Sequence, residues 1–398
     1  MRNLFVDCLR GSCILVVLLL HYSAAFPHDI GLPANFWKTV YQNGYYGVTG
    51  FFVISGYLIT GTSFKRYGRL SSISLKKFYW LRFCRIVPGL LLVLVSLVAL
   101  HCLRAPNFVI PVTHSLRRIL VYALTLRFNL YAGHFGPLGV AWDILWSLAI
   151  EEVFYLGFPL LCLVLRSREA LLTALLAIFA SGPFYRANHQ DLYDYLACFD
   201  QIALGCITAI GVQAPLLQKF VRRRGFRPIL LLTGLGLVFG TYCYKIVDAN
   251  LIFGPTGIAL GMACLLMYSG STAAMPGKRH SRWWLIMAMG AGLLGLMGRI
   301  SYEIYLTHGM VIRYMMARSA SLSAYFASCH ISNPSFFFMM LIFPMILLLG
   351  LLFGNLYTNP VNHYLRKFFS TTTSVGSLPA SRLARPAPAG GATRPPME

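Results

Sequence analysis

The stretch LRGSCILVVLLLHYSAAFP, residues 9–27, decides the fold class. It is apolar almost throughout, and about 20 apolar residues in a helix are enough to cross the hydrocarbon core of a bilayer. Nine further runs of this kind follow along the chain, at residues 44–63, 86–103, 142–165, 169–185, 196–213, 228–244, 251–270, 299–317 and 335–357. The sequence therefore predicts an all-α, polytopic membrane protein with about ten transmembrane helices, within a range of 10–11.

The overall composition supports a membrane protein. Apolar residues make up 57% of the 398 residues and charged residues 12%, about half of the roughly 25% that is usual for soluble domains. This excludes a disordered chain and a secreted disulfide scaffold. The ten cysteines are scattered without a CxxC pair, so we expect neither disulfides nor a metal site.

The basic excess fits contacts with membrane lipids. The chain has 34 Lys and Arg against 12 Asp and Glu, a formal charge of +22. Cytoplasmic loops and anionic lipid headgroups explain such an excess. Because no basic residues cluster within a soluble module, we expect no nucleic-acid partner.

Two shorter runs are ambiguous. Residues 117–131 contain three arginines, and residues 283–297 are uncharged but short. We expect both to be interfacial or re-entrant helices. Ten crossings with a cytoplasmic N-terminus then place 25 of the 34 basic residues in the cytoplasm, as the positive-inside rule favours. The C-terminus is then cytoplasmic too.

The first run is predicted to be a retained helix. Arg10 flanks it, and no small-residue cleavage site precedes a soluble domain. The localisation predicted is thus a multi-pass protein of the cell membrane. We expect one membrane domain at residues 1–369 and a disordered cytoplasmic tail at residues 370–398, which is rich in Ser, Thr, Pro, Ala and Gly.

Ionisable side chains within such spans are functional candidates, because hydrocarbon makes them costly. Arg10 and His21 are 11 residues apart, which in a helix is about 20° past three full turns and roughly 16 Å along the axis. Both therefore share one face. A helix face with a cationic residue at its cytoplasmic end and a buried imidazole further along suits a channel for an anionic substrate. The imidazole at the end of this channel would be the base. The alternative is that His21 only bonds to a neighbouring helix.

A basic cluster precedes the third span, at KKFYWLRFCRIVP (76–88). Arg82 and Arg85 are three residues apart and share a helix face. Their guanidinium forks suit phosphate. The alternative is a plain positive-inside anchor.

Two carboxylates interrupt the fourth span, in WSLAIEEVFY (146–155). Ser147, Glu151 and Tyr155 are spaced by four residues and share a stripe. A buried Glu should pair with Arg or His or be protonated. A structural ion pair is the alternative to a catalytic role.

Two more segments combine polar and small residues. In GRISYEIYLTH (298–308), Ser301, Tyr305 and His308 share a helix side. In GVTGFFVISGYLIT (47–60), the glycines permit close helix approach.

Taken together and in this order, these segments resemble the integral-membrane acyltransferase-3 family, which O-acylates surface glycans and related acceptors. The matching pieces are Arg10-Gly11 with His21, FFVISGY (51–57), the arginines and proline of 82–88, WSL with EExFY in 146–155, and GRISY with YLxH in 298–308. The sequence departs from the family pattern at Thr49, Thr307 and the Thr358-Asn359 pair.

The resemblance implies transfer of an acyl group, expected to be acetyl, from cytoplasmic acyl-CoA to a hydroxyl of a cell-surface carbohydrate or glycolipid. Acyl-CoA would be a co-substrate, with no permanently bound cofactor and no metal. His21 would be the general base or carry the acyl group, Arg10 would stabilise the oxyanion, and Glu151 would orient His21 or hold Arg10. The CoA phosphates would meet Arg82, Arg85, Lys76 and Lys77. The substrate pocket would comprise Ser55, Tyr57, Ser147, Tyr155, Ser301, Tyr305 and His308.

This resemblance also implies a bacterial inner membrane as the location. Two other classes fit parts of the pattern. A transporter or flippase for a lipid-linked sugar explains the spans and the intramembrane charges. A haem protein would need His21 and His308 on facing helices at similar depth.

Overall fold

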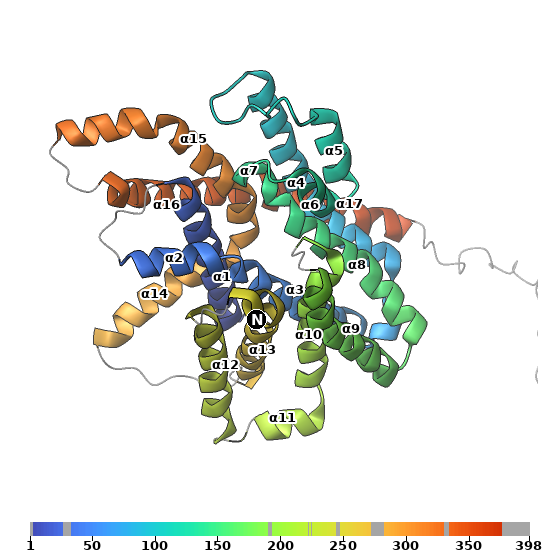
Figure 1. Ribbon diagram of the computed structural model, residues 1–398. Helices are drawn as coiled ribbons and strands as arrows, with labels where there is room; N and C mark the ends of the chain where they lie inside the picture. Colours follow the sequence, from blue (N-terminus) through green and yellow to red (C-terminus); the bar gives the residue numbers. More distant parts are fainter. Residues whose placement is uncertain are drawn as a thin grey trace, which may run out of the picture.

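The chain folds into a helical bundle (Figure 1). The computed structural model describes residues 3–26, 33–189, 193–221, 223, 225–243, 247–271, 282–329 and 334–375. Its helices are α1 (Leu4–Ala25), α2 (Ala34–Asn43), α3 (Tyr46–Tyr67), η1 (Leu70–Ser72), α4 (Leu75–Cys102), α5 (Leu116–Leu124), α6 (Phe128–Phe135), α7 (Val140–Asp143), α8 (Leu145–Leu165), α9 (Arg168–His189), α10 (Tyr195–Val212), α11 (Pro215–Val221), α12 (Phe226–Cys243), α13 (Val247–Ser271), α14 (Arg282–Arg299), α15 (Ser301–Ser328), α16 (Pro334–Phe353), η2 (Gly354–Thr358) and α17 (Asn359–Val375). These residues contain no strand, so the all-α prediction is confirmed.

Nine helical segments of the described chain are long and apolar enough to cross a membrane. They are α1, α3, α4, α7 with α8, α9, α10, α12, α13, and α16 continued into α17. Nine of the ten predicted spans are among them. The tenth, at residues 299–317, lies in α15, which is long but carries Glu303, Arg313 and Arg318. Helices satisfy their own backbone hydrogen bonds, as a lipid environment requires.

Residues 117–131 do not form one helix. They divide between α5, of nine residues, and α6, of eight. At about 1.5 Å per residue, each is only about 13 Å long, so neither can cross alone, as predicted. The break lies at Leu126, whose φ of 59° is left-handed.

The other ambiguous run forms α14, which packs against the first half of α1. A Cβ added to Gly11 would collide with the carbonyl of Leu294, and one added to Gly298 would collide with that of Asp7. Glycines therefore bring the two backbones together. That residues 283–297 do not cross the membrane stays a prediction.

The helices α3 and α10 also approach each other closely at glycines, near the centre of the bundle. A Cβ at Gly56 would collide with the Ile202 carbonyl, and one at Gly205 would collide with the Val53 carbonyl. Small residues allow such close approach in membranes, where van der Waals packing drives helix association. This contact fixes α3 and therefore the position of Ser55.

A buried ion pair joins α9, α10 and α13. Arg186 is 1% exposed and donates to both carboxylate oxygens of Asp200, at 3.0 and 2.9 Å. It also donates to the carbonyls of Ile252 and Ala197 and to the hydroxyl of Thr256. The guanidinium is thus well satisfied, which a buried charge requires.

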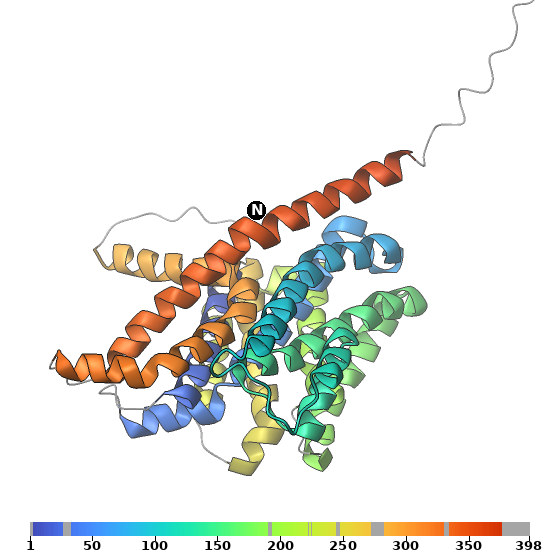
Figure 2. The ribbon, with the colours of Figure 1, turned by 90° about the horizontal axis from the view of Figure 1, so that it is seen from above.

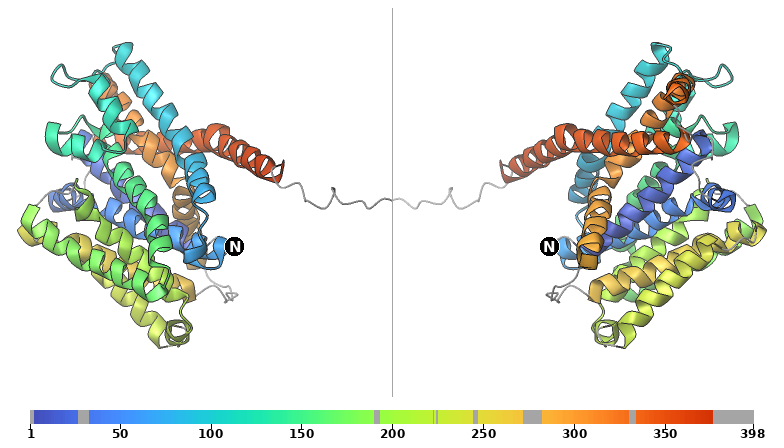
Figure 3. Two further views of the ribbon diagram at one scale, coloured as in Figure 1. Left: turned by 90° about the vertical axis from the view of Figure 1, so that its right-hand side faces the viewer. Right: turned by 90° about the vertical axis from the view of Figure 1, so that its left-hand side faces the viewer.

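The described part of the chain ends in one long helix. α16 passes through the π-helical turn η2 into α17, which leaves the bundle (Figures 2 and 3). The predicted tail at residues 370–398 begins inside α17, which continues to Val375, and residues 376–398 lie outside the described residues.

Candidate active site

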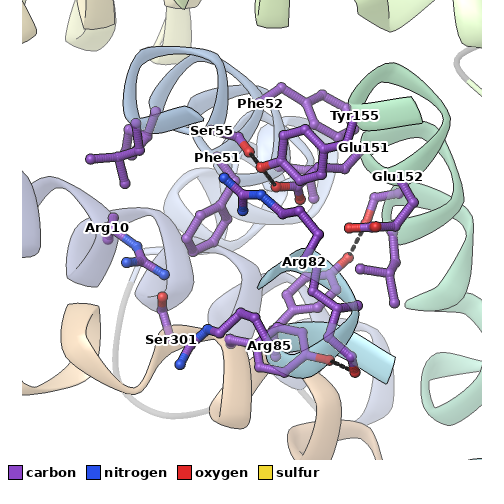
Figure 4. Close-up of a pocket in the computed structure, with 18 residues that line it drawn as sticks. Arg10, Phe51, Phe52, Ser55, Arg82, Arg85, Glu151, Glu152, Tyr155 and Ser301 are labelled. Carbon is purple, nitrogen blue, oxygen red and sulfur yellow. Dashed lines mark hydrogen bonds between the residues drawn. The ribbon is translucent and has the colours of Figure 1, made fainter. Parts of the chain in front are cut away.

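A cavity of about 300 Å³ lies between α1, α3, α4, α8 and α15 (Figure 4). Nine residues singled out from the sequence line it, namely Arg10, Ser55, Arg82, Arg85, Ser147, Glu151, Tyr155, Ser301 and Tyr305. They come from five helices that are distant in the sequence. Folding brings these residues of different helices together around one cavity.

Three arginines give the cavity a positive balance. Arg10, Arg82 and Arg85 line it, against the carboxyl groups of Glu151 and Glu152. The guanidinium carbon of Arg82 lies 4.3 Å from the centre of the Tyr155 ring. Cations over aromatic faces are stabilised without a carboxylate partner. Arg82 is therefore held beside Tyr155 in the cavity wall, where its charge can act on an anion.

Arg85 is partly balanced by a carboxylate from α15. Its guanidinium is 3.7 Å from Oε1 of Glu303, and its Cζ lies 5.4 Å from the centre of the Tyr302 ring. Glu303 also accepts a hydrogen bond of 2.9 Å from the Thr358 hydroxyl. The π-helical turn therefore contributes to the environment of Arg85.

An acid–hydroxyl network lies across the cavity from Arg10. Glu151 Oε1 accepts hydrogen bonds from Ser55 and Tyr155, and these two hydroxyls also contact each other. Figure 4 shows the three groups converging beside Arg82. The predicted partners of Glu151 were His21 or Arg10, whereas the bonds that it makes are to Ser55 and Tyr155.

The other walls are apolar. They consist of Val48, Phe51, Phe52, Ile54, Leu58, Ile86 and Leu148. A cavity that combines cationic groups with an apolar wall suits an elongated ligand with an anionic head and an uncharged arm.

His21 and His308 form a tilted ring pair outside the lining of this cavity. Their ring centres are 5.2 Å apart with 35° between the planes. Nδ1 of His308 lies 3.1 and 2.8 Å from the carbonyl oxygens of Ile304 and Tyr305. A carbonyl only accepts, so this nitrogen carries the proton and Nε2 is left as an acceptor. Within the described residues, the buried Nε2 has no hydrogen-bond partner.

Tyr305 separates the pair from the cavity. Its hydroxyl is 2.6 Å from that of Ser147, and its ring centre is 5.7 Å from that of His308. Neither histidine is among the residues that line the cavity. His21 is therefore not among the cavity residues that include the arginines with which it was predicted to act.

Three other predicted residues lie elsewhere. Tyr57 does not line the cavity and packs against the buried residues of α13. Lys76 and Lys77 are exposed in the first turn of α4, outside the cavity lining.

The sequence analysis assigned no role to four residues of the site. Glu152 and Tyr302 line the cavity, and Glu303 and Thr358 act on Arg85. Glu152, Tyr302 and Glu303 lie inside segments already singled out, which was a usable signal. Thr358 was noted only as a departure from the family pattern, and its contact with Glu303 depends on the π-helical turn.

A family model described as an acyltransferase domain matches residues 3–370, which include every residue of the cavity. The chain belongs to the acyltransferase-3 family. The resemblance inferred from the motifs is thus confirmed. No solved structure matches the chain.

The alignments with curated relatives cover a smaller part of this acyltransferase-family chain than the family model does. The O-acetyltransferase OatA of Staphylococcus aureus (strain NCTC 8325) is 29% identical over 165 residues, 41% of this chain and 25% of OatA. A candidate O-acetyltransferase of S. aureus (strain COL) is 31% identical over 166 residues, 40% of this chain and 24% of that protein. The chain thus spans about a quarter of the length of these relatives.

Proposed function

We propose that the protein is a membrane-embedded O-acyltransferase that moves an acetyl group from cytoplasmic acyl-CoA to a hydroxyl of a cell-surface carbohydrate or glycolipid. One observation carries the proposal: a cavity with three arginines, a carboxylate–hydroxyl network and an apolar wall lies inside an acyltransferase domain. The names of the curated O-acetyltransferase relatives support acetyl as the acyl group and oxygen as the acceptor atom. A location in the bacterial inner membrane fits this proposed function.

The donor enters with its phosphates at Arg82 and Arg85 and its uncharged arm along Phe51 and Phe52. The thioester carbonyl then lies near Arg10, whose charge stabilises the oxyanion of the transition state. CoA serves as a substrate and leaves after each turnover.

The acceptor hydroxyl attacks the thioester carbonyl. His21 takes its proton, a C–O bond forms and the C–S bond breaks. The thiolate of CoA then takes the proton from His21. Tyr305 of the cavity lies beside His308, which in turn lies beside His21, so in the proposed reaction these side chains move before His21 and the acceptor meet.

The experiment uses the full chain in lipid nanodiscs with radiolabelled acetyl-CoA. Thiol release and transfer of label to an added glycan acceptor are the two readouts. We expect both for the wild type. A protein that moves a lipid-linked sugar across vesicles but releases no CoA would instead be the transporter or flippase.

Arg82→Ala and Arg85→Ala test the donor site. Because a charge-assisted contact to phosphate is lost, we expect the donor KM to rise roughly tenfold for each. Arg318→Ala is the matched control, since Arg318 is an exposed arginine stacked on Tyr314 in the second half of α15. A donor KM unchanged in both variants would make the two arginines topology anchors only.

A further inference from the structure

The π-helical turn and the first turns of α17 are docked against α4. The Trp80 indole donates to the Leu365 carbonyl at 3.3 Å, and the Tyr357 hydroxyl donates to the Pro88 carbonyl at 3.4 Å. Both bonds join this part of the chain to α4, the helix of Arg82 and Arg85, and Figure 2 shows the long C-terminal helix running alongside α4. Arg366 follows Leu365 directly and is therefore held beside α4.

Arg366 extends a row of arginines. Its charge lies within electrostatic range of Arg66 at the end of α3 and of Arg82 and Arg85 on α4. Arg85 is in turn within range of Arg10 on α1. Five guanidinium groups from four helices thus lead from the exposed Arg66 and Arg366 to the half-buried Arg10.

Acidic groups do not balance the outer end of this row. Glu303 lies against Arg85, and Glu151 and Glu152 line the inner cavity. Among the described residues, the charged groups that act on Arg366 are Arg66, Arg82 and Arg85. Like charges held together repel each other, and a bound polyanion removes that cost.

We propose that Arg66 and Arg366 bind a second phosphate group of the donor, remote from the diphosphate that Arg82 and Arg85 hold. The assignment rests on the proposed function. One phosphate or diphosphate would occupy Arg82 and Arg85 alone, whereas the row continues to the protein surface. The ligand class that fits is a nucleotide thioester whose ribose carries a phosphate of its own. The C-terminal helix then supplies specificity for that phosphate.

The test compares acetyl-CoA with acetyl-dephospho-CoA, which lacks the ribose phosphate. For Arg366→Ala we expect the KM for acetyl-CoA to rise roughly tenfold. The KM for acetyl-dephospho-CoA should stay unchanged, as should kcat for both donors. Arg366→Lys should restore part of the loss because it keeps the charge. Arg318→Ala is the control and should change neither KM.

Direct binding separates this inference from the proposed function. Calorimetry on the full chain in detergent measures CoA against dephospho-CoA, and the wild type should bind CoA more tightly. Equal affinities, or equal losses for both donors in Arg366→Ala, overturn the inference while acyl transfer stands. A wild type that neither binds CoA nor releases it overturns both. If Arg366→Ala fails to insert, Arg66→Ala makes the same prediction.

Discussion

His21 and Glu151 make different contacts on different helices. His21 lies against His308, whereas Glu151 accepts hydrogen bonds from Ser55 and Tyr155. Tyr305 joins the two regions, with its hydroxyl on the cavity side and its ring beside His308. A base must come within about 3 Å of the proton that it takes, although such bonds can tighten only once substrate is bound. Movement of Tyr305 is therefore part of the proposed reaction.

The base is tested by His21→Ala. Insertion and expression should be unchanged, because His21 is only half-buried and its ring contact is to one neighbour. Loss of a general base should lower turnover by about 10²–10⁴-fold. Transfer of radiolabelled acetyl groups measures it, with His189→Ala, an exposed histidine on α9, as the control. More than about a tenth of wild-type turnover in His21→Ala would contradict the assignment.

At the level of elements, close glycine contacts determine where the helices stand. Gly56 follows Ser55 directly, and its approach to the Ile202 carbonyl fixes α3 against α10. The same helix has Gly61, with nothing within 4 Å of an added Cβ. Two glycines five residues apart are thus a natural comparison.

Gly56→Ala should lower the unfolding temperature and the activity together. The added methyl would push α3 away from α10, and overpacking of this kind costs about 1–3 kcal/mol. Gly61→Ala should leave the unfolding temperature unchanged or raise it slightly, because alanine favours the helix. Thermal unfolding in detergent measures both. Equal unfolding temperatures for the two variants would show that the α3–α10 contact is not tight.

The ion pair between α9 and α10 makes a separate stability prediction. Asp200→Ala leaves Arg186 buried without its carboxylate, which should cost about 3–5 kcal/mol. The double variant Arg186→Met with Asp200→Leu removes both charges and should be more stable than Asp200→Ala. The same unfolding assay ranks the three proteins. A double variant less stable than Asp200→Ala would show that the carbonyl and Thr256 bonds of Arg186 matter more than the pair.

At the level of the whole molecule, the long C-terminal helix fixes an orientation. The segment Ser335–Phe368 has 34 residues, about 50 Å of helix against a hydrocarbon core of about 30 Å. An ordinary tilt of the helix would not fit this length within the hydrocarbon core, so one end of the helix extends beyond the core. Figures 2 and 3 show this end and the start of α1 on one side of the bundle. Arg366 and Lys367 lie there, which favours the cytoplasm for both termini.

Cysteine labelling in a Cys-depleted background tests the topology. An impermeant reagent applied to whole cells should label Val112→Cys, in the loop between α4 and α5. It should label Gly225→Cys and Lys367→Cys only after the membrane is opened. Labelling of Gly225→Cys on intact cells would contradict the non-spanning assignment of residues 117–131. Labelling of Lys367→Cys would contradict that of residues 283–297.

The sequence by itself determined the helices and which face of each one bears the chemistry. Hydrophobic length is a local property, and so is the spacing that aligned Ser147, Glu151 and Tyr155, since both depend only on helix geometry. The prediction that these residues and Arg10 and Arg82 act in one site followed from the family resemblance, and the structure places them around one cavity.

Only the tertiary structure decided which helix each face meets. It turns Tyr57 toward α13, places His21 against His308 outside the cavity lining, and brings α17 to α4 through Trp80. These outcomes depend on helix crossings set by glycine contacts and by the π-helical turn. A crossing is the joint property of two surfaces distant in sequence, so no spacing within one helix encodes it.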